Sequence, residues 1–295
     1  MAISADMVKK LREQTGAGMM DCKKALGETD GDFEKAITLL REKGIAIAQK
    51  RENRSASEGV IAAYVSPDGK AGTIVELNCE TTFVAKTDEF KGLAEDLAKF
   101  ISEQDSSISN ISVDELMGMK MANGETVKEN INAVVAKLGE KTALARFARV
   151  DTDGYLGHYI HTGDQIGVIV NLSCEDPSKP EISQLGRDLA MHIAWSNPNY
   201  LTREDISEED LEKERNVHRQ WAINEGKPEA VLDRIIEGKM KEFYSKTCLL
   251  EQPYIKDEDL SICKLIESVN KAAQDNVEIK SYVRFRVGET ASDAE

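Results

Sequence analysis

The spacing of hydrophobic and polar residues divides the chain into a helical beginning and a strand-rich remainder. In the first 44 residues apolar positions follow a helical period, as Phe33, Ile37 and Leu40 do at i, i+4 and i+7. Breaks between the helical stretches fall at Gly16-Ala17-Gly18 and Asp30-Gly31-Asp32. The pattern predicts three short helices in a small module, followed over residues 41–58 by a linker or an exposed basic helix.

From Gly59 the apolar period becomes that of strands. Val60–Val65 and Gly72–Cys79 flank a Pro67-Asp68-Gly69 turn and predict a hairpin, and a helix with one apolar face follows. The same order returns about 95 residues later, with Tyr64, Gly72, Ile74, Val75, Leu77, Cys79 and Glu80 matched by Tyr159, Gly167, Ile169, Val170, Leu172, Cys174 and Glu175. The sequence therefore predicts an internal duplication, in which each half closes on a strand with an Arg-Phe pair, Arg146-Phe147 and Arg284-Phe285.

An insertion interrupts the second half. Glu204–Asn224 is a charged helical stretch, Gly226-Lys227-Pro228 breaks it, and a second helix with one apolar stripe follows. We therefore expect an α+β fold with a three-helix domain at its start, a duplicated core of two small antiparallel-sheet and helix subdomains, and an inserted antiparallel helical hairpin. The expected boundaries are 1–54 for the helical domain with its basic linker, 55–150 for the first core subdomain, 151–198 with 247–288 for the second, 199–246 for the hairpin and 289–295 for a disordered tail.

The two halves differ in the connection between hairpin and helix. Nine residues separate Glu80 from Phe90, whereas six separate Glu175 from Ile182, and only the longer connection contains an aromatic residue, Phe83. Because most Phe side chains are buried, the residue type favours Phe83 packing on its own helix, which Thr87 would cap. The second half makes this connection without an aromatic residue, so a loop that presents Phe83 outward is the alternative. The duplication weakens the preference for packing without reversing it, and both interpretations stay open.

Composition and charge narrow the function classes. The 295 residues have a formal charge of −15, which disfavours direct binding to nucleic acid, and no apolar run is long enough to span a membrane. We expect a cytoplasmic protein without a cofactor. The five cysteines are scattered singly and predict neither disulfides nor zinc, but small buried residues. His158, His161 and Cys174 near one strand pair would serve an enzyme only if a cleft joined them, so we expect no covalent chemistry.

Two longer segments resemble the elongation factor Ts family. Leu11-Arg12-Glu13-Gln14-Thr15-Gly16-Ala17-Gly18-Met19-Met20-Asp21-Cys22-Lys23-Lys24-Ala25-Leu26 is similar to the N-terminal signature of that family, and Glu76-Leu77-Asn78-Cys79-Glu80-Thr81-Thr82-Phe83-Val84 is similar to its second signature. The resemblance covers nearly the whole chain, and it implies that the three-helix domain is UBA-like. It implies a guanine nucleotide exchange factor that binds elongation factor Tu in its GDP-bound and nucleotide-free states.

The resemblance also implies which residues bind the partner. The loop Thr81, Thr82, Phe83 and Val84 would insert its aromatic side chain into a pocket of the GTPase, displacing the helix beside the magnesium site. Further contacts would come from Leu11, Arg12, Lys23 and Arg51, from Leu138 and Gly139, and from His161, Ile255 and Lys256, the last three facing the third domain of the partner. The sequence is also compatible with a homodimer.

The chain departs from the family pattern at two places. Thr82 stands where the family usually has Asp, so a carboxylate near the magnesium of the partner is missing. Many relatives continue past the last strand into a further helical module, and because this sequence stops at Glu295 we expect that contact to be absent. The competing functional hypothesis is an adaptor that binds a GTPase through its helical modules without changing nucleotide release.

Overall fold

The computed structural model describes residues 3–289, and these residues form two compact units. The first runs to Asp151 and also includes Thr162–Gly167 and Phe285–Glu289. The second contains Thr152–His161 and Val168–Arg284. The fold is α+β, as predicted, with helices and small sheets in both units. The tail predicted to be disordered lies outside the described residues from position 290 onward.

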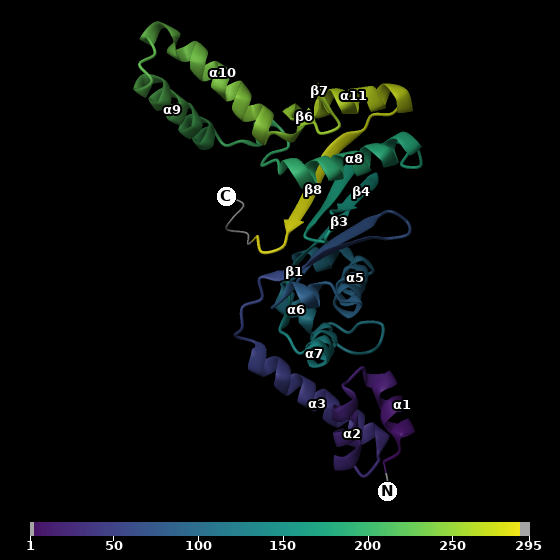
Figure 1. The fold of residues 1–295 in the computed structure, drawn as a ribbon. Coiled ribbons are helices and arrows are strands. Elements are labelled where there is room, and N and C mark those ends of the chain that lie inside the picture. The colour runs from purple at the N-terminus through teal and green to yellow at the C-terminus, as the bar shows by residue number, and fades with distance from the viewer. Residues whose placement is uncertain (1–2, 290–295) are drawn as a thin grey trace. The chain divides into compact units, whose positions relative to one another are not determined.

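The chain begins with three helices: α1 (Ala5–Thr15), α2 (Met19–Glu28) and α3 (Phe33–Arg51) (Figure 1). Ser4 caps α1 by accepting a hydrogen bond from the Met7 amide, and Gly16 ends it in the left-handed region at φ 65°. The module has its own small core of Val8, Leu11, Cys22, Ala25, Leu26 and Ala36. The predicted three helices are confirmed, and the basic stretch after residue 41 continues α3 as a helix rather than beginning as a linker.

The first half of the duplication is a three-stranded sheet covered by helices. Its order is β1 (Glu58–Val65), β2 (Ala71–Cys79) and β3 (Thr142–Asp151), all antiparallel, with an irregularity in β2 between Glu76 and Leu77. The connecting elements are α4 (Thr82–Ala85), α5 (Asp88–Ser102), η1 (Ser106–Asn110), α6 (Val113–Met117) and α7 (Val127–Leu138). The apolar face of α5 packs on β1 and β2, and α7 packs on α5, which closes the core.

The buried Glu76 carboxylate joins this sheet to the last described residues. Glu76 in β2 accepts hydrogen bonds from Arg146 Nε at 2.7 Å and from the Gly288 amide at 2.8 Å. The Arg146 guanidinium lies over the Phe285 ring, 4.2 Å from its centroid. Both Arg-Phe pairs of the sequence thus contribute to one contact, which fixes Phe285–Glu289 in the first unit.

The second half repeats the sheet and its helix. Its sheet has the order β4 (Tyr155–Ile160), β5 (Ile166–Ser173) and β8 (Glu278–Arg286), and α8 (Pro180–Ser196) packs on β4. The helix approaches the strand closely, since a Cβ at Gly157 would lie 2.5 Å from backbone atoms of Gly186. Before β8 come η3 (Leu249–Glu251), the short pair β6 (Pro253–Tyr254) and β7 (Asp257–Ser261), and α11 (Ile262–Ala273).

The insertion is a helical hairpin. After η2 (Arg203–Asp205), α9 (Glu208–Asn224) starts at its predicted cap Ser207, and α10 (Glu229–Thr247) returns beside it (Figure 1). Gly226 makes the turn at φ 68°, where the Lys227 amide donates to the Ala222 carbonyl. Ala222, Leu232, Ile236 and Met240 form the buried seam. In the part of the chain that the structure describes, no helix is long and apolar enough to cross a membrane.

Candidate partner-binding site

Phe83 is presented to solvent by a very short helix. α4 has only four residues, and its third and fourth, Val84 and Ala85, are buried in the core. The Phe83 side chain, on the opposite side, is 85% exposed, although Phe residues usually avoid water. The interpretation in which Phe83 packs on its own helix is therefore wrong, and the outward one agrees with the structure. The predicted cap is confirmed, because Thr87 Oγ1 accepts a hydrogen bond from the Phe90 amide.

Both ends of the Phe83 loop, residues 81–84, are anchored. At its start Thr81 Oγ1 accepts a hydrogen bond from the Val84 amide at 3.4 Å, which caps α4. At its end the Val84 carbonyl accepts from Thr87 Oγ1 at 2.8 Å. A short segment with a fixed start, a buried far side and a fixed end has few backbone conformations available. The loop therefore holds Phe83 in a defined direction although its side chain is 85% exposed.

Glu80, immediately before the loop, accepts hydrogen bonds from three residues in two segments. Its carboxylate accepts hydrogen bonds from the Lys141 amide at 2.7 Å, from Arg51 Nη1 at 3.2 Å and from Arg54 Nη1 at 3.0 Å. These donors, the Lys141 amide first, hold the pKa of Glu80 below its usual range. The side chain of Lys141 donates in turn to the Glu52 carbonyl. Glu80 thereby joins the end of α3 to the base of the Phe83 loop.

Arg51, which is expected to contact the partner, forms an ion pair inside the chain. Its side chain is 24% exposed and pairs with Glu80 inside the chain. The pairing shows that Arg51 supports the Phe83 loop whether or not it also touches another protein.

Leu138 and Gly139 lie close to the loop. Leu138 ends α7 and packs partly against the core, and Gly139 follows it in the left-handed region at φ 74°, where a Cβ would meet no atom within 4 Å. The next residue, Glu140, bonds to Thr81 at the start of the Phe83 loop. The structure therefore brings together two of the predicted contact points, which are more than 50 residues apart in the sequence.

The helical module supplies a third group of predicted residues. Arg12 and Lys23 are exposed and available to a partner. Leu11 is fully buried in the core of the module, so the structure does not support a direct contact from its side chain. Sequence reasoning missed Met19 and Met20, whose side chains are exposed in the first turn of α2 next to Lys23. The signal in the sequence was the pair of adjacent Met residues at the start of the helix, because Met is common at binding surfaces.

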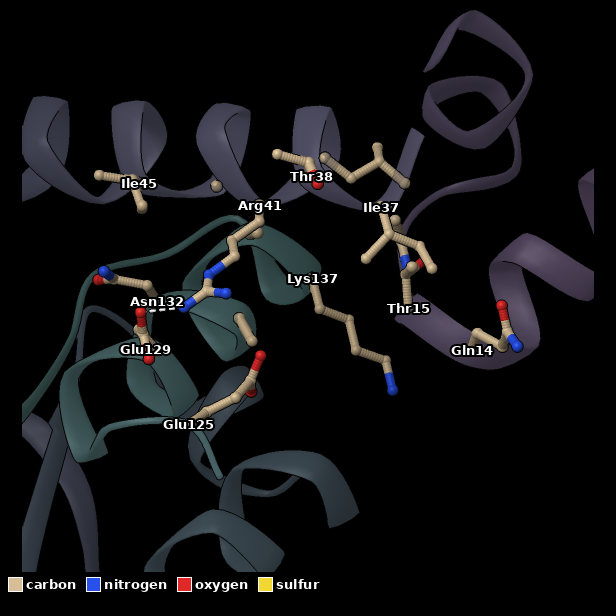
Figure 2. Close-up of a pocket in the computed structure, with 15 residues that line it drawn as sticks. Gln14, Thr15, Ile37, Thr38, Arg41, Ile45, Glu125, Glu129, Asn132 and Lys137 are labelled. Atoms are coloured by element: carbon tan, nitrogen blue, oxygen red, sulfur yellow. Dashed lines mark hydrogen bonds and ion pairs between the residues drawn. The ribbon is translucent and has the colours of Figure 1, made fainter. Parts of the chain in front are cut away.

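A groove of about 350 Å³ lies between this module and α7 (Figure 2). Its floor has close packing of small residues, since a Cβ at Gly44 would lie 3.1 Å from the Cβ of Ala136. Arg41 of α3 and Glu129 of α7 form an ion pair across it, shown as the dashed line in Figure 2. At the opposite rim Lys137 reaches position 16, where a Cβ would lie 3.4 Å from its Cδ. The groove thus marks the seam where the module rests on α7, next to Leu138.

The predicted residues of the second unit occupy two places. His161, just after β4, is exposed and its Nδ1 lies 3.1 Å from the Tyr159 hydroxyl. Ile255 and Lys256 form the turn between β6 and β7, where Lys256 Nζ pairs with Asp188 of α8 at 2.7 Å. Ile255 is half-buried and Lys256 is exposed.

Other titratable groups are structural. His192 is buried, donates from Nε2 to Gln252 Oε1 at 2.9 Å, and has its pKa lowered by burial. Burial also raises the pKa of the Cys79 thiol, to about 11. The expectation that all cysteines are buried is wrong for Cys263, which is exposed, and for Cys174, which is half-buried. Within residues 3–289 no group of three or more His, Cys, Asp or Glu is placed to hold a metal ion.

Fold and site together define a protein of the binding class. It is an α+β protein that presents a fixed, exposed aromatic side chain, and such side chains are typical anchors of protein interfaces.

Comparison with known proteins gives the family. The family model described as Elongation factor TS matches residues 80–289. Elongation factor Ts of Clostridium perfringens strain ATCC 13124 is 45% identical over 289 residues, covering 97% of this chain and 93% of its own length. The proteins of the same name from Clostridium botulinum strain Alaska E43 and Clostridium acetobutylicum are 44% identical with the same coverage. The chain belongs to the elongation factor Ts family, and from that membership follows a role in translation elongation through nucleotide exchange on elongation factor Tu.

Proposed function

We propose that the chain releases GDP from elongation factor Tu by inserting Phe83 into a pocket of the GTPase that is open only when the nucleotide site is disturbed. The observation that supports this most is the 85% exposure of Phe83 on a loop whose two ends are fixed. A fixed loop loses little conformational entropy on binding, so more of the gain from burying the ring remains as affinity.

The exchange follows from thermodynamic linkage. If the factor binds nucleotide-free elongation factor Tu more tightly than the GDP-bound form, its binding weakens GDP by the same ratio. Burial of a Phe side chain contributes about 1.5–3 kcal/mol. When this is gained only in the nucleotide-free state, it favours that state by about 10- to 150-fold.

The other predicted residues take supporting roles in this proposal. Arg12 and Lys23 of the helical module, with Leu138 and Gly139, would contact the nucleotide-binding domain of the partner. Leu11 and Arg51 would act mainly inside the chain, in the core of the module and beside Glu80. His161, Ile255 and Lys256 would contact the third domain of the partner.

We propose the same modules as the sequence suggests: residues 1–54, 55–150, 151–198 with 247–288, and the hairpin 199–246. We place the activity in the cytoplasm and propose that it involves no covalent chemistry. We also propose no direct contact to nucleic acid, because the formal charge of −15 repels phosphate. Light scattering of the free and the complexed protein measures whether it forms a homodimer.

Stopped-flow release of fluorescent GDP from elongation factor Tu tests the role of Phe83. Phe83→Ala should slow release by at least about tenfold at a factor concentration below saturation. The release rate with Phe83→Leu should lie between those of Phe83→Ala and the wild type. Trp195→Ala is the matched control, because Trp195 is also an exposed aromatic residue, 79% exposed, outside the proposed contacts.

The same assay separates exchange from adaptor function. A chain that binds elongation factor Tu and leaves its GDP release rate unchanged would be an adaptor. An unchanged rate with Phe83→Ala, in a wild type that does accelerate release, would show that Phe83 is not the inserted group.

A further inference from the structure

We propose that Glu140 is a positioning residue for nucleotide exchange, because its carboxylate fixes the start of the helix that presents Phe83. The inference rests on the proposed role of Phe83. Glu140 itself is not among the residues that we propose to contact the partner.

The Glu140 carboxylate binds Thr81 with both of its oxygens. Oε2 accepts from the Thr81 amide at 3.0 Å, and Oε1 accepts from the Thr81 hydroxyl at 2.8 Å. Hydrogen bonds to a charged acceptor are stronger than neutral ones. Two of them to one residue fix both its position and the rotation of its side chain.

The direction of these bonds matters for α4. Since the Thr81 hydroxyl donates its proton to Glu140, its lone pairs face the Val84 amide, and the cap of α4 is completed. The Thr81 carbonyl accepts from the Ala85 amide at 3.2 Å and from Cys79 Sγ at 3.2 Å. All polar groups of Thr81 are therefore satisfied, and Phe83 follows two residues later.

Glu140 is itself held in place. It follows Gly139, whose left-handed conformation ends α7, and it precedes Lys141, whose amide donates to Glu80. The carboxylates of Glu80 and Glu140 thus clamp the connection between α7 and β3 onto the connection between β2 and α4 from both directions.

The second half of the duplication contains a corresponding clamp without an aromatic residue. There Gln274 ends α11 in the left-handed region at φ 50°, and the next residue, Asp275, accepts hydrogen bonds from the amides of Glu175 and Asp176. Those two residues open the connection between β5 and α8. A carboxylate after the last helix of each half therefore holds the loop between hairpin and helix.

The two clamps allow the structural role of the carboxylate to be distinguished from its effect on Phe83. In the second half the clamp serves the fold alone, since its loop presents no large apolar side chain. In the first half the clamp holds a connection between hairpin and helix that is three residues longer and includes Phe83. Asp275→Ala is therefore a matched control for Glu140→Ala: both remove a clamp, and only one clamp is next to Phe83.

A double-mutant cycle with GDP release as the readout tests the proposal. Glu140→Ala should slow release about five- to tenfold in the wild-type background and have almost no further effect in a Phe83→Ala background, because the loop then has no ring to direct. Glu140→Gln, which keeps one carbonyl acceptor, should show an intermediate rate. Asp275→Ala should leave the release rate unchanged.

Each other outcome is decisive. Equal slowing by Glu140→Ala in both backgrounds would assign Glu140 a purely structural role and overturn the proposal. Unchanged release with Glu140→Ala, while Phe83→Ala slows it, would overturn the proposal and leave the role of Phe83 intact. Unchanged release with Phe83→Ala would overturn both. If Glu140→Ala does not fold, the same comparisons apply to Glu140→Gln.

Discussion

Two phenylalanines seven positions apart should respond very differently to the same substitution. Phe83 is 85% exposed, whereas Phe90, in the first turn of α5, is fully buried between that helix and the sheet. Replacing each by Ala removes the same atoms from two environments. We expect Phe83→Ala to leave the stability of the protein nearly unchanged and Phe90→Ala to reduce it strongly.

The magnitudes follow from burial. Complete burial of a Phe side chain stabilises by about 1.5–3 kcal/mol, and with roughly 15% of its surface covered Phe83 contributes about 0.2–0.5 kcal/mol. The higher helix propensity of Ala offsets part of this loss. Removal of a fully buried Phe also leaves a cavity, so Phe90→Ala should cost about 3–5 kcal/mol.

Urea unfolding followed by far-UV circular dichroism measures the difference. With a denaturant dependence of about 1–3 kcal/mol per molar urea, Phe90→Ala should lower the midpoint of the first unit by more than about 1 M, and Phe83→Ala should lower it by at most about 0.5 M. A loss of more than about 1 kcal/mol in Phe83→Ala would refute the reasoning, because the ring would then be packed on the protein in solution.

Three further predictions concern other parts of the chain. Gly157→Ala should cost about 1–3 kcal/mol, because its Cβ would meet the Gly186 backbone at 2.5 Å, while Gly238→Ala, with no atom within 4 Å, should stabilise α10 by up to about 1 kcal/mol; equal melting temperatures would contradict this. Backbone amides, that of Glu175 foremost, lower the pKa of Asp275. The stability that the Asp275 carboxylate provides is therefore complete above the usual carboxylate pKa of about 4 and is lost as the pH falls further. Asp275→Asn should flatten the acid side of the pH profile of the urea midpoint, and an unchanged profile would count against the clamp. Thr82→Asp should change the rate of GDP release by no more than about fivefold, since a surface charge in the first turn of a helix contributes at most about 1 kcal/mol, and a larger change would show that the carboxylate matters more.

The arrangement of secondary structure was largely predictable because it depends on local periodicity. The hairpin of β1 and β2, its turn and the repeat of both in the second half follow from apolar alternation and turn residues. The helices α7 and α11 were missed, although Val127, Ile131 and Val135 at i, i+4 and i+8 show the same kind of signal.

The candidate site was predictable in position and only partly in geometry. The duplication identified the loop that contains Phe83, but the residue type favoured burial. What decides its exposure is a helix of four residues fixed at both ends, one of them by Glu140, which is 59 positions away from Thr81. A contact between distant residues leaves no periodic signal in one sequence.

The sequence signature also mixed two kinds of residue. Leu11 and Arg12 are neighbours in the same motif, yet Leu11 fills the core of the module while Arg12 faces solvent. Successive positions of a helix point in different directions, so a motif alone does not distinguish a residue that supports a surface from one that forms it.

The most direct test of the insertion of Phe83 is calorimetric titration of the wild type and Phe83→Ala into nucleotide-free and GDP-bound elongation factor Tu. Because the ring should be buried only when the nucleotide site is open, the substitution should weaken binding to the nucleotide-free form by about 10- to 150-fold and hardly affect binding to the GDP-bound form. Equal weakening of both complexes, or none, would contradict exchange driven by Phe83.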